Sequence, residues 1–351
     1  MINFMAPINQ LGYGHAGFNI FKSLQKKCDV ALHLIGQPQV VSQQDAATIR
    51  SGLELATKFD PKAPCIKVWH QNQMAERIGS GKFIGFPIFE LDTFTDAEKH
   101  HLSCCDEIMV CSHWAKDVII DNIGEKPVHV VPLGVDSEVF KPSPMASADK
   151  TIFFTCGKWE VRKGHDILIK AWDRLTQINP DVELWMMTEN PFNTPEEEEK
   201  WKKLYRRPNI KFIPRVQTHL GVYNIMKDSH CGIFLSRAEG WNLEALEMMA
   251  AGKPIIITNY SAHTEFCNKE NSLLIDIDSK EPAHDGKWFF GQGNWASIQQ
   301  EQINKAVEYM LKICDHRKSE EEQICKIVDN SIKTAQKFSW DFSAERILNH
   351  V

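Results

Sequence analysis

The stretch SRAEGWNLEALEMMAAGKPIIITN, residues 236–259, combines two carboxylates with the start of a predicted helix. Asn242 can cap a helix that ends near Gly252, so Glu239 falls on the preceding loop and Glu247 in the second turn. The first backbone amides of a helix have no partner within it and attract anions. Carboxylates accept hydrogen bonds from vicinal hydroxyls, so the pattern suits a sugar phosphate. An amphipathic helix with one capping and one exposed acid would show the same spacing.

A second stretch, CGKWEVRKGHDILIKAW (156–172), supplies positive charge. Lys158, Arg162 and Lys163 lie on the expected turn between a strand and a helix. Cations at such a turn can neutralise a diphosphate that leaves as a glycosidic bond breaks. Taken alone, the stretch is equally typical of loop cations at the end of a strand.

Near the start of the chain, GYGHAG places Gly12, Gly14 and Gly17 in the pattern G-x-G-x-x-G, after an apolar run and before a helix-like segment. This is the fingerprint of a dinucleotide-binding loop. Such a site also needs an acid at the end of the second strand, but here the strand VALHLI is followed by GQPQ. The pattern therefore disfavours an NAD-dependent oxidoreductase. We expect the glycines to let the backbone approach a sugar nucleotide, with the helix start directed at its diphosphate.

The elements that must hold these residues alternate between short apolar runs and helical patterns, which predicts parallel, doubly wound sheets. We expect strands at residues 2–6, 30–35, 65–70, 82–89, 106–111 and 128–133, and again at 151–158, 182–189, 210–215, 231–236, 254–259 and 272–277. The segment KPSPMASADK (141–150) has no periodicity and predicts a linker between two α/β domains. Ligands of such proteins bind at the carboxyl ends of the strands, so we expect them in a cleft between the domains.

Capping residues mark the starts of several helices. Thr95 with Glu98 forms the pattern of a capping box, Ser112 can cap the following segment, and Thr194 precedes Pro195 at a first helical position. The chain after about Gln299 is predicted to be helical and charged.

Composition bounds the class of protein. A chain of 351 residues with 43% hydrophobic and 25% charged residues suits two globular domains, and its net charge of −6 gives no general attraction to nucleic acid or anionic membranes. Ten cysteines without a C-x-x-C pair predict reduced thiols in a cytoplasmic protein. The first apolar stretch is interrupted by Pro7 and Asn9, so we expect no secretory signal, and no apolar run approaches the length of a membrane span.

Three motifs together resemble the retaining glycosyltransferases of family 4. The family's E-G-F-G-L-P-x-x-E-A-M-A-x-G-x-P corresponds to EGWNLEALEMMAAGKP (239–254), its G-R-x4-K-G to GKWEVRKG (157–164), and its P-x-G-V-D-x-x-x-F-x-P to PLGVDSEVFKP (132–142). The resemblance covers most of the second half and the hinge. It implies the GT-B fold, two Rossmann-like domains whose parallel sheets face across a cleft. The implied parts are an acceptor-side domain (1–143), a nucleotide-sugar domain (144–334), and a C-terminal helix (335–351) that packs back on the first domain.

The resemblance also implies a role for each matched position. Glu239 would hold the hydroxyls of the donor sugar and Glu247 those of the ribose. Lys158 and Lys163 would bind the diphosphate, and Arg215 would lie near the base. The full set of expected donor-binding residues is Gly14, Lys158, Arg162, Lys163, Arg215, Glu239, Gly240, Trp241, Asn242, Leu243 and Glu247.

The sequence departs from the family's motifs at two places. Lys158 replaces the commoner arginine and cannot form a bidentate fork, and Trp241-Asn242 replaces Phe-Gly beside the expected sugar. In the first domain, His70 ends one strand and Glu90 another, where many relatives have a histidine. We expect both in the cleft. With Glu239, Lys163 and Lys158 they complete the expected catalytic set, although a locally hydrogen-bonded His70 fits equally well.

The predicted function is transfer of a hexose or pentose from a UDP- or GDP-sugar to a hydroxyl, with retention and without a metal or other cofactor. The acceptor is a glycan, a lipid or a modified DNA base. A hydroxymethylated base in viral DNA would require a basic acceptor domain, yet residues 1–142 contain thirteen Lys and Arg against sixteen Asp and Glu. A non-catalytic sugar-nucleotide binder, or a nucleotide-sugar epimerase on the same fold, is a different class of function that the motifs leave open.

Overall fold

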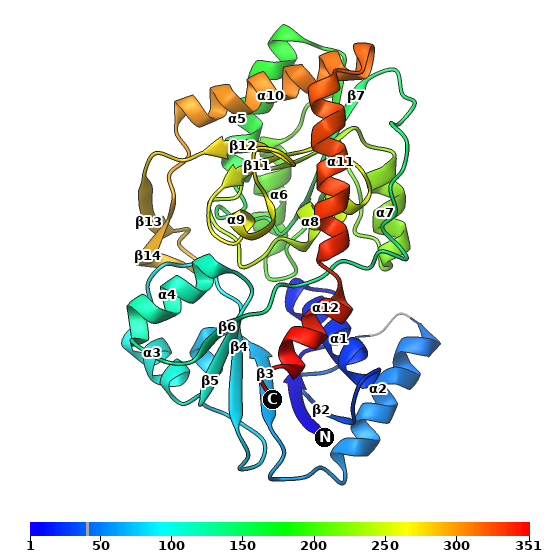
Figure 1. Ribbon diagram of the computed structural model, residues 1–351. Helices are drawn as coiled ribbons and strands as arrows, with labels where there is room; N and C mark the ends of the chain where they lie inside the picture. The colour runs from blue at the N-terminus through cyan, green and yellow to red at the C-terminus, as the bar shows by residue number, and fades with distance from the viewer. Residues whose placement is uncertain (40–41) are drawn as a thin grey trace. The chain divides into compact units, whose positions relative to one another are not determined.

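The computed structural model describes residues 1–39 and 42–351, which form two compact units (Figure 1). The first unit comprises Met1–Gly134 and Phe338–Val351, and the second Val135–Lys337. The sequence predicts divisions after residues 143 and 334. In the structure the backbone N–H of Ser143 donates to the carbonyl of Ala251 at 3.1 Å, a bond inside the second unit.

The first unit contains a parallel sheet of six strands in the order β2-β1-β3-β4-β5-β6. The strands are β1 (Ile2–Ala6), β2 (Val30–Leu34), β3 (Cys65–Trp69), β4 (Phe83–Pro87), β5 (Glu107–Val110) and β6 (Val128–Val130). The helices are α1 (Gly12–Gln25), α2 (Gln43–Ala56), α3 (Asp96–Ser103), α4 (His113–Ile123) and α12 (Trp340–Leu348), with a short 3₁₀ turn η1 (Gln71–Gln73). Most strand residues are buried because helices cover the sheet, as parallel sheets require.

The second unit contains another parallel sheet of six strands, in the order β12-β11-β10-β7-β8-β9. The strands are β7 (Thr151–Gly157), β8 (Val182–Thr188), β9 (Ile210–Phe212), β10 (Cys231–Phe234), β11 (Ile255–Asn259) and β12 (Leu273–Asp276). The helices are α5 (His165–Ile178), α6 (Pro195–Leu204), α7 (His219–Lys227), α8 (Leu243–Ala250), α9 (His263–Phe266), α10 (Gln300–Ser319) and α11 (Glu322–Lys337). Helix α5 lies beside α10, and α8 beside α11 (Figure 1).

The predicted doubly wound fold is confirmed, and each of the twelve parallel strands falls within a predicted segment. The caps at Thr95, Ser112 and Thr194 are confirmed as well. Sequence reasoning predicts no strand at the antiparallel hairpin of β13 (Lys280–His284) and β14 (Phe290–Ala296), and it names no helix at α2, α7 or α9. The strands of the hairpin, KEPAH and FGQGNWA, lack the alternation of apolar and polar residues that indicates a strand.

The strand orders determine where ligands can bind. Within each sheet the winding reverses once, between β1 and β3 in the first unit and between β7 and β10 in the second. Connections leave such neighbouring strands toward opposite faces, which opens a crevice at their carboxyl ends. In the second unit this crevice is bordered by the loops 158–164 and 235–242, which carry the residues that the sequence singles out for chemistry.

Gly164 brings these two loops together. It caps the start of α5 with a φ of +71°, in the left-handed region that favours glycine. A Cβ atom at this position would lie 1.8 Å from the carbonyl oxygen of Leu235, at the end of β10. The close backbone approach therefore requires a residue without a side chain.

We expect Gly164→Ala to lower the free energy of unfolding by more than about 2 kcal/mol, because strain at positive φ and a backbone clash act together. Gly286→Ala is the matched control, since Gly286 has a φ of +72° and a Cβ atom there would meet no other atom within 4 Å. It should lose only about 1–2 kcal/mol. Equal losses in chemical denaturation of the two variants would show that the contact with Leu235 is unimportant.

Candidate functional site

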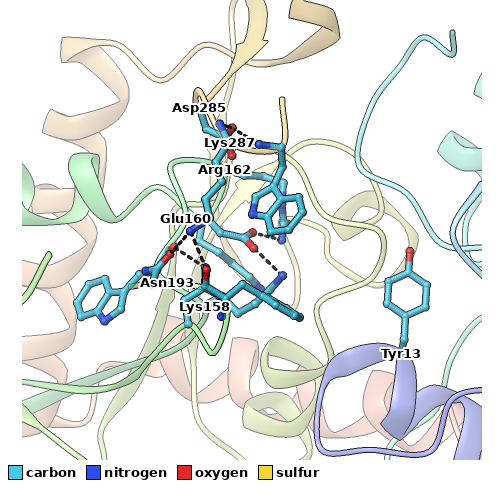
Figure 2. Close-up of polar contacts among 12 residues, drawn as sticks. Tyr13, Lys158, Glu160, Arg162, Asn193, Asp285 and Lys287 are labelled. Atoms are coloured by element: carbon cyan, nitrogen blue, oxygen red, sulfur yellow. Dashed lines mark hydrogen bonds and ion pairs between the residues drawn. The ribbon is translucent and has the colours of Figure 1, made fainter. Parts of the chain in front are cut away.

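The loops after β7 and β10 meet in a chain of alternating charges. Lys158 Nζ lies 2.6 Å from Glu160 Oε1, and Arg162 Nη2 lies 2.7 Å from Glu160 Oε2 (Figure 2). Arg162 Nη1 then lies 2.8 Å from Glu239 Oε2, and Lys163 Nζ 2.9 Å from Glu239 Oε1. Three cations face two carboxylates, so the cluster has an excess of one positive charge. We call these five residues the charge chain.

The acidic members of the charge chain are held ionised. Burial by itself would raise the pKa of Glu239, but Lys163 and Arg162 outweigh it and hold that pKa well below its usual range. Burial would likewise raise the pKa of Glu160, and Arg162 with Lys158 lowers it. Burial acts to lower the pKa of Lys163, whereas Glu239 raises it above the ordinary value. The charges are therefore fixed in place before any ligand arrives.

Hydrogen bonds fix the orientation of the Glu239 side chain further. Ser236 Oγ donates to Glu239 Oε1 at 2.7 Å, and the backbone N–H of Glu239 donates to Ser261 Oγ at 2.8 Å. A carboxylate offers about four acceptor positions, and Arg162, Lys163 and Ser236 occupy three of them. One position is left for a donor such as a sugar hydroxyl.

Lys158 is the member of the charge chain that solvent reaches most easily, with 34% of its side chain exposed against 11% for Lys163. Its Nζ also lies 5.6 Å from the centroid of the Phe192 ring. The sequence did not identify Glu160, which orients both Lys158 and Arg162. In the sequence, Glu160 stands between Lys158 and the pair Arg162–Lys163, and this position is the signal that could have indicated it.

Asn242 explains a departure from the family's motif. Its φ is +81°, a conformation that glycine adopts freely and asparagine more readily than other residues. As predicted, it caps α8, since its Oδ1 accepts from the N–H of Ala245 at 3.2 Å. Its Nδ2 donates to His263 Nε2 at 2.9 Å, and His263 Nδ1 donates to the carbonyl of Thr258 at 2.8 Å. Burial lowers the pKa of His263 to about 4, so a neutral imidazole supports the cap.

The remaining expected donor residues of the second unit lie around the start of α8 or at the same edge of the sheet. Trp241 is only 3% exposed and packs against Phe266 with ring centroids 5.0 Å apart, so its indole belongs to the core. Gly240 is buried and Leu243 half-buried. Arg215 follows β9 and pairs with Glu189 at 3.5 Å.

Glu247 differs from the charge chain because no cation in the described ranges forms an ion pair with it. It is half-buried on α8, and no donor in the described part of the chain hydrogen-bonds to its carboxylate. Burial raises the pKa of Glu247 well above its usual range, and the negative charges of Glu244 and Asp136 add to this effect. A ligand that supplied hydroxyl donors would favour the ionised form of this carboxyl.

In the first unit, side chains gather at the switch point between β1 and β3. The Tyr13 hydroxyl lies 2.9 Å from His70 Nδ1 and donates to the carbonyl of Ile88. The Tyr13 and His70 rings are 4.3 Å apart. Glu90 follows β4 and is half-buried. Tyr13 is not identified by the sequence, because GYGHAG predicts a glycine loop, whereas the tyrosine lies in the first turn of α1.

Gly14 has a structural task that the sequence did not reveal. It lies inside α1, and a Cβ atom there would be 2.2 Å from the carbonyl oxygen of Asn9. Because Gly14 has no side chain, the backbone of Asn9 can pack directly against α1. Gly12, at the first position of the helix, has open space instead.

Two kinds of site are absent from the described residues. Residues 1–39 and 42–351 contain no group of three or more His, Cys, Asp or Glu arranged to hold a metal ion. In the same residues, no helix has the length and apolar character needed to cross a membrane.

Parts of the chain are similar to known proteins. Residues 149–285 match the family model of the glycosyl transferases group 1. The second unit is therefore similar to family 4-like glycosyltransferase domains. An MMP alpha-(1->4)-mannosyltransferase of Mycolicibacterium hassiacum is 29% identical over 177 residues, which are 49% of this chain and 41% of that protein. A GDP-mannose-dependent alpha-(1-6)-phosphatidylinositol dimannoside mannosyltransferase of Mycobacterium tuberculosis is 25% identical over 199 residues, 54% of this chain and 51% of that protein. The chain thus spans about half the length of the curated relatives that it matches.

The fold extends the similarity over the whole chain. The crystal structure of Anabaena Alr3699/HepE in complex with UDP and glucose matches with a TM-score of 0.70 at 15% identity, covering 99% of this chain and 98% of that one. The two-sheet architecture is that of the GT-B glycosyltransferases, as the motifs predict.

We expect stability to depend on pH through Glu239. Because its folded-state pKa is depressed, its contribution is present above the unfolded-state value of about 4.3 and is lost as the pH falls below it. Glu239→Gln should lower the free energy of unfolding at pH 7 by about 3 kcal/mol, since the buried Lys163 loses its counter-charge and Arg162 keeps only Glu160. The variant's stability should also decline less steeply below about pH 4.

The matched control for this measurement is Glu138→Gln, because Glu138 pairs with Lys141 on the surface with 87% of its side chain exposed. Surface pairs contribute less than about 1 kcal/mol. Denaturant titrations between about pH 3 and 7 span the expected change. If the free energies of unfolding of Glu239→Gln and the wild type changed with pH in parallel, a depressed pKa of Glu239 would be contradicted.

Proposed function

We propose that this protein transfers a sugar from a nucleoside-diphosphate sugar to a hydroxyl acceptor, with retention at the anomeric carbon. The observation that carries the proposal is the charge chain at the switch point of the second sheet, with its excess positive charge and its exposed end at Lys158. This is where doubly wound folds bind nucleotides.

The diphosphate is the part of the donor that the site fits best. Lys158 and Lys163 supply fixed positive charge, and the amides at the start of α8 add the favourable end of a helix dipole. One solved relative is described in complex with UDP and glucose, and one curated relative as GDP-mannose-dependent. Both ligands contain a nucleoside diphosphate, which supports a UDP- or GDP-sugar here.

In the proposed reaction the bond between the anomeric carbon and the β-phosphate oxygen breaks, and its electron pair stays on the phosphate. The acceptor oxygen bonds to the same carbon from the same face, and its proton passes to the departing phosphate oxygen. The products are a glycoside and a protonated nucleoside diphosphate. Lys158, Lys163 and the α8 amides stabilise the negative charge that develops on the phosphate.

Glu239 and Glu247 have different roles in the proposed reaction. Glu239 is held by two cations and a hydroxyl, so it acts as an acceptor for a sugar hydroxyl and keeps Arg162 and Lys163 in position. We assign no nucleophile to it. Glu247, which lacks a counter-charge, accepts from the ribose hydroxyls. His70 and Glu90 of the first unit are proposed to act on the acceptor side, together with Tyr13.

The state of the cysteines supports a cytoplasmic location for this activity. All ten are thiols rather than disulfides, and seven of them are buried. Such cysteines are usual in proteins of reducing compartments.

A panel of nucleotides tests the proposal. We expect UDP or GDP to raise the melting temperature of the wild type, and Lys158→Met to weaken that nucleotide about tenfold, equivalent to about 1.4 kcal/mol. Lys211→Met is the matched control, because Lys211 pairs with Glu183 at 2.8 Å, away from the charge chain. A shift by NADH without a response to any nucleoside diphosphate would refute the proposal.

Because Glu247 has no counter-charge among the described residues, we expect its carboxylate to lower stability without ligand but to strengthen nucleotide binding. Without ligand, Glu247→Gln should raise the melting temperature by about 2–4 °C, because about 1 kcal/mol of unfavourable burial is removed. The same variant should bind the nucleotide more weakly, since an amide accepts from two ribose hydroxyls less well than a carboxylate. Thermal scans with and without nucleotide measure both effects. A variant that is less stable without ligand would contradict this view of the site.

A further inference from the structure

The second unit has another pocket, at the opposite edge of its sheet from the charge chain. The pocket has a volume of about 200 Å³. Two of its lining residues lie where strands begin: His230 immediately precedes β10, and Lys253 lies two residues before β11. His316 and Arg317 reach it from the last turn of α10. The proposed donor site, by contrast, lies where strands end.

Lys253 is a buried cation without a close counter-charge. The residue is 2% exposed, and its Nζ donates to the carbonyl of Pro144 at 2.7 Å. In the described part of the chain, no carboxylate lies within ion-pair distance of this ammonium. Burial lowers the pKa of Lys253 to about 8, and the more distant Asp228 opposes the shift. The group is thus mostly charged at neutral pH, with donors to spare, which is unfavourable unless an anion is present.

Arg317 adds a second cation that is held by neutral groups. Its Nε donates to Thr151 Oγ1 at 3.0 Å, Nη1 to the carbonyl of Ala148 at 2.8 Å, and Nη2 to the carbonyl of Asp149 at 3.0 Å. A guanidinium has five N–H donors, so two remain. The arginine is therefore fixed in position while still able to bind an anion.

The two histidines of the pocket differ. His230 Nδ1 accepts from the N–H of Ile152, and its Nε2 donates to the carbonyl of Ala146, each at 3.0 Å. Burial lowers its pKa to about 4, so it is a neutral structural residue. His316 is 7% exposed, and its Nδ1 is buried without a hydrogen-bond partner in the described part of the chain. Burial lowers the pKa of His316 too, while Glu321 and Glu320 oppose the shift.

We propose that this pocket binds a phosphate group, either as inorganic phosphate or as a short phosphate monoester, with Lys253 and Arg317 as its charge partners. His316 Nδ1 supplies a further polar contact. The volume is below the roughly 300 Å³ at which pockets for drug-sized ligands begin, so the ligand is small. Asp329 is the acidic residue in the lining, so the two cations leave the pocket with net positive charge. The inference is independent of the proposed sugar transfer.

The position of the pocket gives the ligand a regulatory role. The carbonyls of Pro144, Ala148 and Asp149, which the two cations hold, belong to the segment that enters the second unit. Val328, which also lines the pocket, belongs to α11, through which the chain leaves the second unit. A bound phosphate would therefore stiffen both passages of the chain between the units.

Calorimetric titration of the full chain with inorganic phosphate, at constant ionic strength, tests the site. We expect saturable binding, a dissociation constant at least tenfold larger in Lys253→Met, and one two- to threefold smaller in Asp329→Asn, which removes a repelling charge from an exposed position. Glycerol 3-phosphate serves as the ester probe: tighter binding than phosphate identifies a monoester as the ligand, and equal binding identifies the phosphate group alone.

Two control variants locate the anion. Lys269→Met alters an exposed surface pair and should leave binding unchanged. Lys158→Met alters the proposed donor site and should also leave it unchanged. Loss of phosphate binding in Lys158→Met but not in Lys253→Met would place the anion at the donor site and overturn the inference. A non-saturable response that all variants share, including Asp329→Asn, would overturn it as an ionic-strength effect.

Discussion

The neutralisation of Glu239 by Arg162 and Lys163 is the interaction on which the candidate site depends. All three side chains are almost inaccessible to water, and a charge removed from water is tolerated only with close partners. Glu160 and Lys158 extend the neutralisation outward to solvent. The loops after β7 and β10 cannot move independently while these ion pairs persist. The same contacts that stabilise the loops also hold positive charge where a diphosphate would lie.

The sequence predicts the fold well because the signals are local. Apolar runs and capping residues mark strands and helix starts, and the three motifs point to Glu239, Lys158 and Lys163, which the structure brings together. What it does not predict depends on contacts between distant segments. Gly14 is needed because the backbone of Asn9 packs against it. Tyr13 contacts His70 at the carboxyl end of β3. Glu160 would need the three-dimensional pairing to be recognised at all. Lys253 lies inside a recognised motif, but only its burial shows that its charge lacks a partner.

The second unit uses the two edges of one sheet for different purposes. At the carboxyl edge, the buried charges of the charge chain are matched within the protein, whereas Glu247 is left without a partner among the described residues. At the amino edge, Lys253 and Arg317 are held by backbone carbonyls and a hydroxyl rather than by carboxylates. Matched charges favour a permanent, preorganised site, whereas unmatched charges make stability depend on a ligand. The edges should therefore respond differently to their ligands, the first with little structural change and the second with added stability.

The first unit is discontinuous in the sequence, and this affects how the protein forms during synthesis. Helix α12 packs on α1, and a Cβ atom at Gly134 would lie 2.2 Å from the backbone nitrogen of Trp340, so the last residues fit closely against the first. A ribosome delivers α12 only after the whole of the second unit has emerged. Until α12 emerges, the nascent first unit lacks the helix that packs on α1. Translation order thus makes the N-terminal unit the last to be finished.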